Sequence, residues 1–180
     1  MSKNIKKIVI TGVESTGKST LAAALAKYYH TVWVREYARA YLADLNRPYE
    51  FADLSHIAQG QRAAEQSLLP RAHRFLFCDT GMLVLKIWSM YKYGKCDPFI
   101  ATRLERGYDL YVLCGLKDAE WEADPLREMP DEAERRQLHL RYKSELQQLK
   151  VPHLEVSGSV EQRRQQVTDY LLSPPATDAL

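Results

Sequence analysis

Hydrophobic and polar positions follow two patterns that alternate along the chain. Short apolar runs indicate buried strands at residues 7–11, 31–35, 75–79, 110–114 and 153–156. Longer segments with helical apolar spacing indicate helices at residues 18–29, 53–70, 82–93, 98–106, 132–149 and 160–172. Strands that alternate with helices predict an α/β protein, in which a mainly parallel five-stranded sheet lies between two layers of helices.

The connection after the first strand carries the clearest chemical signal. Residues 12–19 read Gly-Val-Glu-Ser-Thr-Gly-Lys-Ser, which fits the P-loop pattern between a strand and a helix. The glycines let consecutive N–H groups point at phosphate oxygens, and the following helix adds its positive N-terminal end. In this pattern Lys18 reaches the β- and γ-phosphates and the Ser19 hydroxyl holds Mg2+. We therefore expect ATP and Mg2+ to bind at Gly12, Glu14, Ser15, Thr16, Gly17, Lys18, Ser19 and Thr20.

Length and composition narrow the class of protein. The 180 residues suit a single P-loop domain at 1–172, followed by a tail at 173–180 that we expect to be disordered. The 25 basic and 23 acidic residues leave a net charge of +2, which does not indicate nucleic-acid binding. The three cysteines lack metal-ligand spacing, and the chain shows neither a signal-like start nor an apolar run of ~20 residues. We expect a soluble, cytoplasmic protein that does not bind membranes.

Two carboxylates stand where predicted strands end. Glu36 follows the second strand and Asp79 ends the third, so both should face the γ-phosphate region beyond the carboxyl ends of the sheet. A kinase that acts on an alcohol needs one carboxylate for the hydroxyl proton and another for the metal. Asp79 follows four apolar residues, so we assign it to Mg2+, directly or through water, and Glu36 to the acceptor hydroxyl; the two roles can be exchanged. The structural alternatives are a helix-start carboxylate for Glu36 and an N-cap for Asp79.

Aromatic residues favour an acceptor with a flat ring. Tyr37, Trp88, Tyr91 and Trp121 fall near the predicted ligand edge rather than within regular core patterns. We expect Trp88 or Tyr37 to stack on the acceptor, with plain packing as the alternative.

Two further segments have both a binding and a structural interpretation. Gln59 and Gln61 flank Gly60 within a predicted helix, where a backbone or a ligand can approach closely; the alternative is an exposed polar face. Ser157 lies after the last strand, where a loop can contact the nucleotide base; the alternative is a helix cap.

The segment 115–130 is a polar stretch between the fourth strand and a charged helix. It contains Trp121, Asp124 and Arg127. Long loops inside compact domains are usually functional or disordered, and a lid that brings arginine to the transferred phosphate would stabilise its charge. We predict a lid here, with a solvated connection as the alternative.

Several short motifs follow the P-loop in order along the chain: E-Y-A-R at 36–39, G-Q-R at 60–62, F-C-D-T at 77–80, D-P-F at 97–99, Y-D at 108–109 and W-E-A-D-P-L-R at 121–127. In this combination the chain resembles the ribosylnicotinamide kinase domain of the NadR family over nearly its whole length. The resemblance implies transfer of phosphate from ATP to the ribose 5′-hydroxyl of nicotinamide riboside, which supplies NAD salvage. It makes Lys18, Ser19 and Asp79 the phosphate and metal residues and Arg127 the lid contact.

These motifs also define the expected acceptor site. We expect substrate contacts from Glu36, Tyr37, Arg39, Gln61, Trp88 and Trp121, and catalytic roles for Lys18, Glu36, Asp79 and Arg127.

The resemblance has two departures. NadR proteins carry an adenylyltransferase domain, so we expect a stand-alone kinase domain here. They continue the Asp-Thr pair with another acidic residue, where this chain has Gly81, and that difference bears on the substrate. Kinases of other nucleosides use the same scaffold, which keeps them as an alternative. A nucleotide-dependent regulatory ATPase switch is the alternative from another class.

Overall fold

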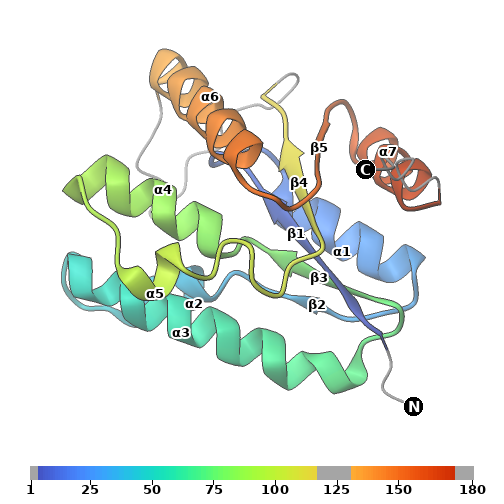
Figure 1. Ribbon diagram of the computed structural model, residues 1–180, viewed down its shortest axis with the longest axis horizontal. Coiled ribbons are helices and arrows are strands. Elements are labelled where there is room, and N and C mark those ends of the chain that lie inside the picture. The colour runs from blue at the N-terminus through green and yellow to red at the C-terminus, as the bar shows by residue number, and fades with distance from the viewer. Residues whose placement is uncertain (1–3, 117–130, 173–180) are drawn as a thin grey trace.

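The computed structural model describes residues 4–116 and 131–172 (Figure 1). Within these ranges, the strands are β1 (Lys6–Thr11), β2 (Trp33–Val34), β3 (Phe75–Asp79), β4 (Leu110–Cys114) and β5 (His153–Val156). The helices are α1 (Lys18–Tyr28), α2 (Tyr37–Asp44), α3 (Phe51–Leu68), α4 (Met82–Tyr93), α5 (Pro98–Ala101), α6 (Glu132–Gln148) and α7 (Val160–Leu172), with a short 3-10 helix η1 (Leu69–Arg71) after α3. No helix in the described ranges has the length and apolar character needed to cross a membrane.

The strands form one parallel sheet in the order β2-β3-β1-β4-β5. The central strand is β1, where Ile8 pairs with Phe77 of β3 on one side and with Leu110 of β4 on the other. Because neighbouring strands extend from β1 in both directions, the loop after β1 lies at the crevice where open α/β sheets bind ligands. The predicted five-stranded parallel sheet is confirmed.

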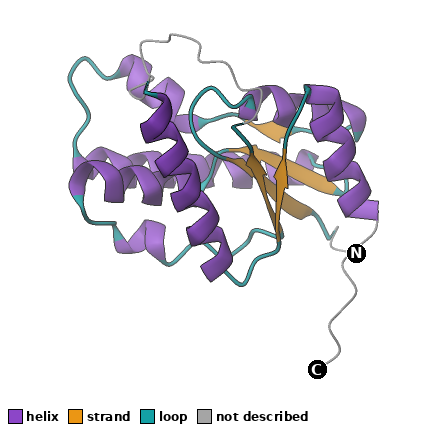
Figure 2. Cartoon of the chain, turned by 90° about the horizontal axis from the view of Figure 1, so that it is seen from above, coloured by secondary structure: helices purple, strands orange, loops and turns teal. Residues whose placement is uncertain are grey.

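Side chains of β1 alternate between two apolar layers. Ile8 and Ile10 pack against α1 and α7, whereas Val9 packs in the cluster formed with α3, α4 and α6. Figure 1 shows these two groups of helices on opposite faces of the sheet, and Figure 2 shows the same layers from above. The predicted three-layer α/β/α architecture is therefore confirmed.

Strand β2 is shorter than its apolar run predicted. Thr31, at the start of that run, uses its hydroxyl group to join the sheet: Oγ1 donates to the Phe75 carbonyl and accepts from the His73 N–H, both at 2.8 Å. Side-chain bonds therefore replace the ladder there, and regular pairing is confined to Trp33–Val34.

Two helices also differ from the prediction. The helix expected at 98–106 ends at Ala101, after one turn capped by the Asp97 side chain, which accepts from the Phe99 N–H at 2.6 Å. Helix α2 was not predicted. None of its residues is fully buried, and Tyr37, Ala38, Tyr41 and Leu42 form a partly buried face that packs on the core. The helix has only eight residues, which is too short a segment for its apolar spacing to be recognised with the longer helices.

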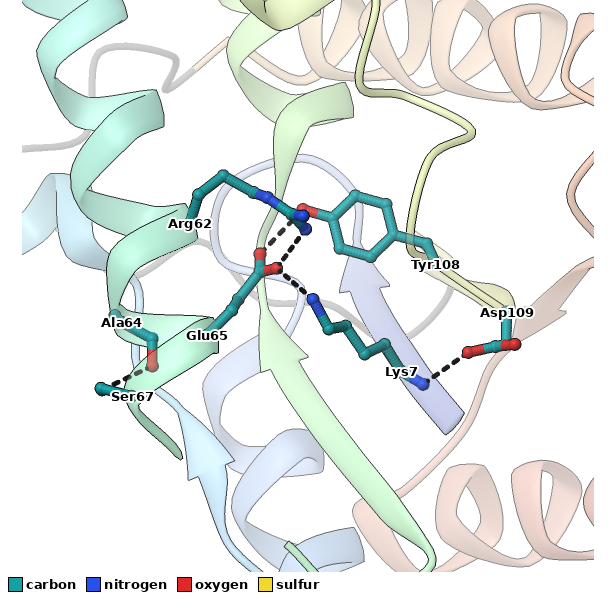
Figure 3. A network of polar contacts seen from close by, with 7 residues as sticks. All are labelled: Lys7, Arg62, Ala64, Glu65, Ser67, Tyr108 and Asp109. Carbon is teal, nitrogen blue, oxygen red and sulfur yellow. Dashed lines mark hydrogen bonds and ion pairs between the residues drawn. The ribbon is translucent and has the colours of Figure 1, made fainter. Parts of the chain in front are cut away.

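A buried ion cluster fixes α3 against the sheet (Figure 3). Glu65 is fully buried, and its Oε2 accepts from Lys7 Nζ at 3.2 Å and from Arg62 Nη1 at 2.7 Å. Its Oε1 accepts from the Tyr108 hydroxyl at 2.8 Å. The cluster joins β1, α3 and the segment before β4. Because a buried charge without its partner is costly, α3 cannot slide along the sheet without breaking this cluster.

Helix α2 is held over α3 at Gly60. A Cβ atom on Gly60 would lie 2.1 Å from the ring of Tyr37, so only glycine allows this contact. The Tyr37 backbone N–H also donates to Gln61 Oε1 at 2.9 Å. The close approach expected at Gly60 is therefore made by a side chain of the protein itself.

Replacing Gly60 by alanine should lower the free energy of unfolding. At an unrestricted helix position this change stabilises by up to about 1 kcal/mol. Here the new methyl group overlaps the Tyr37 ring, and overpacking costs about 1–3 kcal/mol. Urea unfolding of Gly60→Ala checks this, with Gln59→Ala as the control because Gln59 is exposed on the same helix. A Gly60→Ala protein as stable as the parent would show that the contact does not hold α2 in place.

Candidate functional site

Three residues of the P-loop have positive φ values, in the region that favours glycine, and two of them are glycines. Gly12, Ser15 and Gly17 have φ values of 133°, 56° and 76°. A Cβ atom on Gly12 would also lie 3.0 Å from the carbonyl oxygen of Cys114, at the end of β4. Ser15 holds a left-handed conformation without being glycine, which is a strained arrangement of the kind found at ligand sites. The P-loop predicted between β1 and α1 is therefore present, and its backbone turns tightly at these three residues.

Carbonyl groups of the P-loop are held by donors around it. In a trans peptide the C=O group and the next N–H point in opposite directions, so a donor that holds a carbonyl on the outside turns the next N–H inward. Inward N–H groups can bind phosphate oxygens. The donors are Thr16 Oγ1 and Lys18 Nζ for the Val13 carbonyl, each at 2.8 Å, Arg135 Nη2 for the Glu14 carbonyl at 3.2 Å, and Arg163 Nη1 for the Thr16 carbonyl.

Asp79 ends β3 beside the start of α1. Asp79 is 2 % exposed, and Ser19 of α1 lies close enough to influence its carboxylate. Burial raises the pKa of Asp79 to about 6; the Ser19 hydroxyl opposes that rise, the charge of Glu36 adds to it, and Lys18 and Arg39 oppose it. The N-cap of α4 is Gly81, so the alternative role of Asp79 as a helix cap does not apply.

The chemistry of this position fits Mg2+. Asp79 Oδ1 is buried without a hydrogen-bond partner in the described part of the chain, and the Ser19 hydroxyl lies beside the carboxylate. Within residues 4–116 and 131–172, no group of three or more His, Cys, Asp or Glu side chains could hold a metal alone. Mg2+ commonly uses one or two protein oxygens together with substrate phosphates and water. Ser19 and Asp79 are therefore the residues that would hold it.

A cavity lies between the P-loop and helices α2, α3 and α4. It contains about 660 Å3 of empty space, part of it open to solvent. Its polar lining includes Glu14, Glu36 and Gln61, and its aromatic lining includes Tyr49 and Trp88. Glu36 occupies the N-cap position of α2 but makes no side-chain capping bond, so its carboxylate is not used to cap the first turn of the helix. The cavity volume itself is about 90 Å3. The cavity lies next to the phosphate site, which is where a kinase holds its acceptor.

Gln61 presents a donor to this cavity. The residue is 2 % exposed, and its Oε1 is occupied by the Tyr37 N–H. The Nε2 group is buried and has no hydrogen-bond partner among the described residues. A buried donor of this kind is costly unless a ligand or water accepts from it. Because the Tyr37 N–H must donate to an oxygen, the amide oxygen of Gln61 faces Tyr37 and its NH2 group faces the cavity. The ligand atom next to this NH2 group should therefore be a hydrogen-bond acceptor.

The turn after β3 forms one wall of the cavity. Thr80 has a φ of 66°, an outlier for a β-branched residue, and its N–H donates to the Ile10 carbonyl at 3.0 Å. Gly81 contributes its backbone to the wall. A Cβ atom on Gly81 would point into the interior, 3.0 Å from Val9 Cγ1 and 3.2 Å from the Tyr108 hydroxyl. An acidic side chain at position 81 would therefore need this region to rearrange.

The segment between α2 and α3 is tied down by Asp53. This carboxylate accepts from the Arg47 guanidinium at 2.7 and 2.8 Å, from the Tyr41 hydroxyl at 2.7 Å and from the Glu50 N–H at 2.7 Å. Hydrogen bonds from Arg47 and then Glu50 hold the pKa of Asp53 well below its usual range. The segment includes Tyr49, so the cavity wall is held in place by an ionised, buried carboxylate.

The loop after β5 is also fully engaged. The Ser157 N–H and carbonyl both pair with the Gln166 side-chain amide, at 3.3 and 2.8 Å. Ser159 and Gln162 cap α7 reciprocally: Ser159 Oγ accepts from the Gln162 N–H, and Gln162 Oε1 accepts from the Ser159 N–H. The capping role that we considered for this loop is therefore present at Ser159, while a contact of Ser157 with a nucleotide base stays a prediction.

The structure gathers many of the predicted site residues. Lys18, Ser19 and Asp79 lie at the P-loop, and Glu36, Gln61 and Trp88 line the cavity, as does the P-loop residue Glu14. Thr20 is exposed in the first turn of α1. Arg39 is exposed on α2 but close enough to Asp79 to affect its pKa, whereas the ring of Tyr37 packs on Gly60. Trp121 and Arg127, and most of the predicted lid, lie outside the described residues.

Sequence reasoning missed three residues of the site. Arg135 and Arg163 donate to P-loop carbonyl groups that lie 121 and 147 residues earlier in the sequence. No residue pattern near the P-loop predicts these two contacts. Tyr49 lines the cavity from a segment without regular apolar spacing. For Arg163 alone the sequence held a partial indication: it lies in the first half of the predicted helix 160–172, directly after the Ser157 loop that we considered as a nucleotide contact.

The parallel sheet, the P-loop after its central strand and the adjoining cavity define a P-loop nucleotide-binding domain. Residues 7–163 match the family model described as AAA domain, and the chain belongs to this family. It is 28 % identical over 171 residues to the Trifunctional NAD biosynthesis/regulator protein NadR of Escherichia coli (strain K12). That match covers 92 % of this chain but 39 % of the relative, so this chain spans less than half the length of the protein it matches.

Solved structures show the same fold. A NadR protein in complex with NR superposes with a TM-score of 0.74 at 20 % identity, over 98 % of this chain and 54 % of the other. A NadR protein in complex with NAD and AMP-PNP gives 0.69 at 19 % identity, over 98 % and 52 %. Deoxyadenosine kinase from M. mycoides, with bound products, gives 0.64 at 16 % identity, over 92 % and 98 %. The predicted resemblance to the NadR P-loop domain is confirmed.

The raised pKa of Asp79 predicts how stability depends on pH in the protein free of metal and nucleotide. Because the pKa is about 6 in the folded state, against an ordinary value of 3.8 in the unfolded chain, only the folded state holds the proton between these values. The free energy of unfolding should then fall as pH rises from 4 to above 6, by up to about 3 kcal/mol. Asp79→Asn should remove that slope and be more stable than the parent at pH 7.

Urea unfolding in EDTA across this pH range measures the effect. Asp44→Asn is the control, because Asp44 is an exposed residue of α2. If the parent and Asp79→Asn show the same slope, burial does not penalise the Asp79 carboxylate as described.

Proposed function

We propose that this protein is an ATP-dependent kinase that transfers the γ-phosphate of MgATP to the 5′-hydroxyl of nicotinamide riboside. The observation that carries the proposal is the cavity beside the P-loop, which is lined by Glu36, Gln61 and Trp88. A nucleotide-dependent switch needs a loop that responds to the γ-phosphate but no cavity for an acceptor. A kinase needs both sites next to each other.

The two strand-end carboxylates divide the work between them. Asp79 lies near Ser19 on the P-loop side and is not among the described residues that line the cavity, whereas Glu36 lines it. This arrangement supports Asp79 for the metal and Glu36 for orienting the hydroxyl and accepting its proton. Bound Mg2+ would neutralise charge on the β- and γ-phosphates. Lys18 sits at the loop, where one of its three donors holds the Val13 carbonyl and the others can reach phosphate.

The charge of the cavity favours a nucleoside over a nucleotide as the acceptor. Glu14 and Glu36 are carboxylates, and no lysine or arginine is among the described residues that line it. These carboxylates would repel the phosphate group of a nucleotide acceptor and would attract the positively charged ring of nicotinamide riboside. Trp88 offers a face for stacking on that ring. The Gln61 Nε2 group offers a donor to its carboxamide oxygen.

The comparisons support the same class of activity. The relatives and structural neighbours include NadR proteins and a deoxyadenosine kinase, which supports a P-loop phosphotransferase of the nucleoside kinase type that uses ATP. The NadR protein in complex with NR supports nicotinamide riboside as the first acceptor to test. Arg127 and Trp121 remain our predictions for the contacts that close over the reacting groups.

A coupled assay of ADP release tests this function directly. The purified protein is offered MgATP with nicotinamide riboside, ordinary ribonucleosides, deoxynucleosides and nucleoside monophosphates. We expect selective turnover of nicotinamide riboside, and a fall of about 100-fold or more in Lys18→Ala, which loses a donor to the transferred phosphate. The product is identified by mass, so that ATP hydrolysis is not mistaken for transfer.

The other outcomes are equally informative. Faster turnover of another nucleoside would keep the kinase mechanism and replace the substrate. Selective use of monophosphates would contradict the charge argument. ATP hydrolysis stimulated by a protein partner, without any phosphorylated acceptor, would replace the kinase by a regulatory switch.

Gln61→Glu should weaken the acceptor and leave the nucleotide unaffected. The change keeps an oxygen for the Tyr37 N–H but replaces the Nε2 donor by a second acceptor oxygen. Loss of a buried hydrogen bond of this kind should raise the KM of the acceptor by about tenfold or more. Steady-state kinetics with each substrate varied in turn measure the two KM values. Gln59→Glu, on the exposed face of α3, is the control; equal KM values in both variants would remove Gln61 from the acceptor site.

A further inference from the structure

Arg163 of α7 joins two loops at the nucleotide site. Its Nη1 group donates to the Thr16 carbonyl in the P-loop, and its Nε group donates to the Gly158 carbonyl at 2.7 Å. The residue is 6 % exposed, and it lies close enough to the buried thiol of Cys114, at the end of β4, to oppose the rise that burial causes in the pKa of that thiol. A single planar side chain therefore joins the P-loop to the loop after β5, next to the end of β4.

The charge of Arg163 has no carboxylate to balance it. In the part of the chain that the structure describes, its hydrogen-bond partners are two carbonyl oxygens, and no ion pair includes it. Burying a guanidinium in this way is costly unless a nearby anion compensates it. Arg163 lies against the backbone of the P-loop, since an added Cβ atom on Gly17 would lie 3.6 Å from its Nη1. A phosphate group bound by the N–H groups on the other side of this backbone would be the nearest anion that the site can supply.

We propose that Arg163 is a positioning residue for the triphosphate, which sets the direction of the P-loop N–H groups and whose charge is balanced by the bound phosphates. Its bond to the Thr16 carbonyl turns the N–H of Gly17 to the opposite side, into the concavity. Its bond to Gly158 fixes the loop after β5 relative to the P-loop. The proposal needs nucleotide binding alone and does not depend on which acceptor is phosphorylated.

The adjacent Arg164 provides a matched control. It pairs with Glu161 on the same helix and lies over the ring of Tyr28, at 4.1 Å from the ring centroid. It makes no contact with the P-loop among the described interactions. Arg163→Gln and Arg164→Gln each remove one arginine from α7. A difference in ligand affinity between them therefore reports on the position of Arg163 rather than on net charge.

The experiment compares Arg163→Gln, Arg163→Lys and Arg164→Gln. Calorimetry measures the dissociation constants of MgATP and of inorganic tripolyphosphate, and kinetics measure the KM of the acceptor. We expect Arg163→Gln to bind both MgATP and tripolyphosphate about tenfold or more weakly, because a charged, buried hydrogen-bond donor is lost. The KM of the acceptor should change little. Arg163→Lys keeps the charge but cannot bridge two carbonyls, so it should fall between the parent and Arg163→Gln.

Melting temperatures without ligand separate positioning from folding. Arg163→Gln that binds MgATP as tightly as the parent overturns the proposal. A parallel loss of nucleotide and acceptor affinity, together with a lower melting temperature, overturns it as well, because that result marks a general structural role. If Arg163→Gln does not fold, Arg163→Lys decides: unchanged affinity for both phosphate ligands contradicts the proposal, and a selective loss supports it. Failure of the acceptor assay alone bears only on the proposed kinase activity.

Discussion

A phosphate-binding loop that turns its N–H groups inward must leave its carbonyl groups on the outside, where each needs a donor. The rest of this site follows from that requirement. Thr16 and Lys18 satisfy one carbonyl from within the loop and its helix, and the arginines of α6 and α7 satisfy two more. The helices that flank the sheet therefore do more than cover its faces, because their arginines complete the backbone of the loop.

Helix α3 connects the interior of the protein with the acceptor cavity. Gln61 and Glu65 lie one helical turn apart, so the first faces the cavity while the second is locked into the ion cluster with Lys7 and Tyr108 (Figure 3). Tyr108 also backs the cavity wall at Gly81. The position of the Gln61 amide is therefore set by buried charges further along the same helix, and a small shift of α3 would change both at once.

The sequence alone predicted what local patterns encode. The parallel sheet followed from apolar runs alternating with helical spacing, and the P-loop and Asp79 followed from residues next to strand ends. Helix α2 was not predicted because its eight residues are fewer than a helical pattern needs to be recognised, although Tyr37, Ala38, Tyr41 and Leu42 form a partly buried apolar face. Arg135 and Arg163 were not predicted as site residues because their partners are backbone carbonyls more than 100 residues away, and a backbone carbonyl has no sequence signature. The partner of Gly60, the ring of Tyr37, likewise became known only once α2 was placed.

The central position of β1 has a consequence for how the chain folds during its synthesis. Its residues pair with β3, near position 75, and with β4, near position 110, while Arg163 is close to the end of the described chain. Pairing between segments so distant in sequence is slow and requires most of the polypeptide. During synthesis the glycine-rich loop emerges first, yet its anion cradle is complete only when α7 has left the ribosome. We therefore expect a growing chain to remain unable to capture ATP, and nucleotide to stabilise the finished fold rather than to guide its formation.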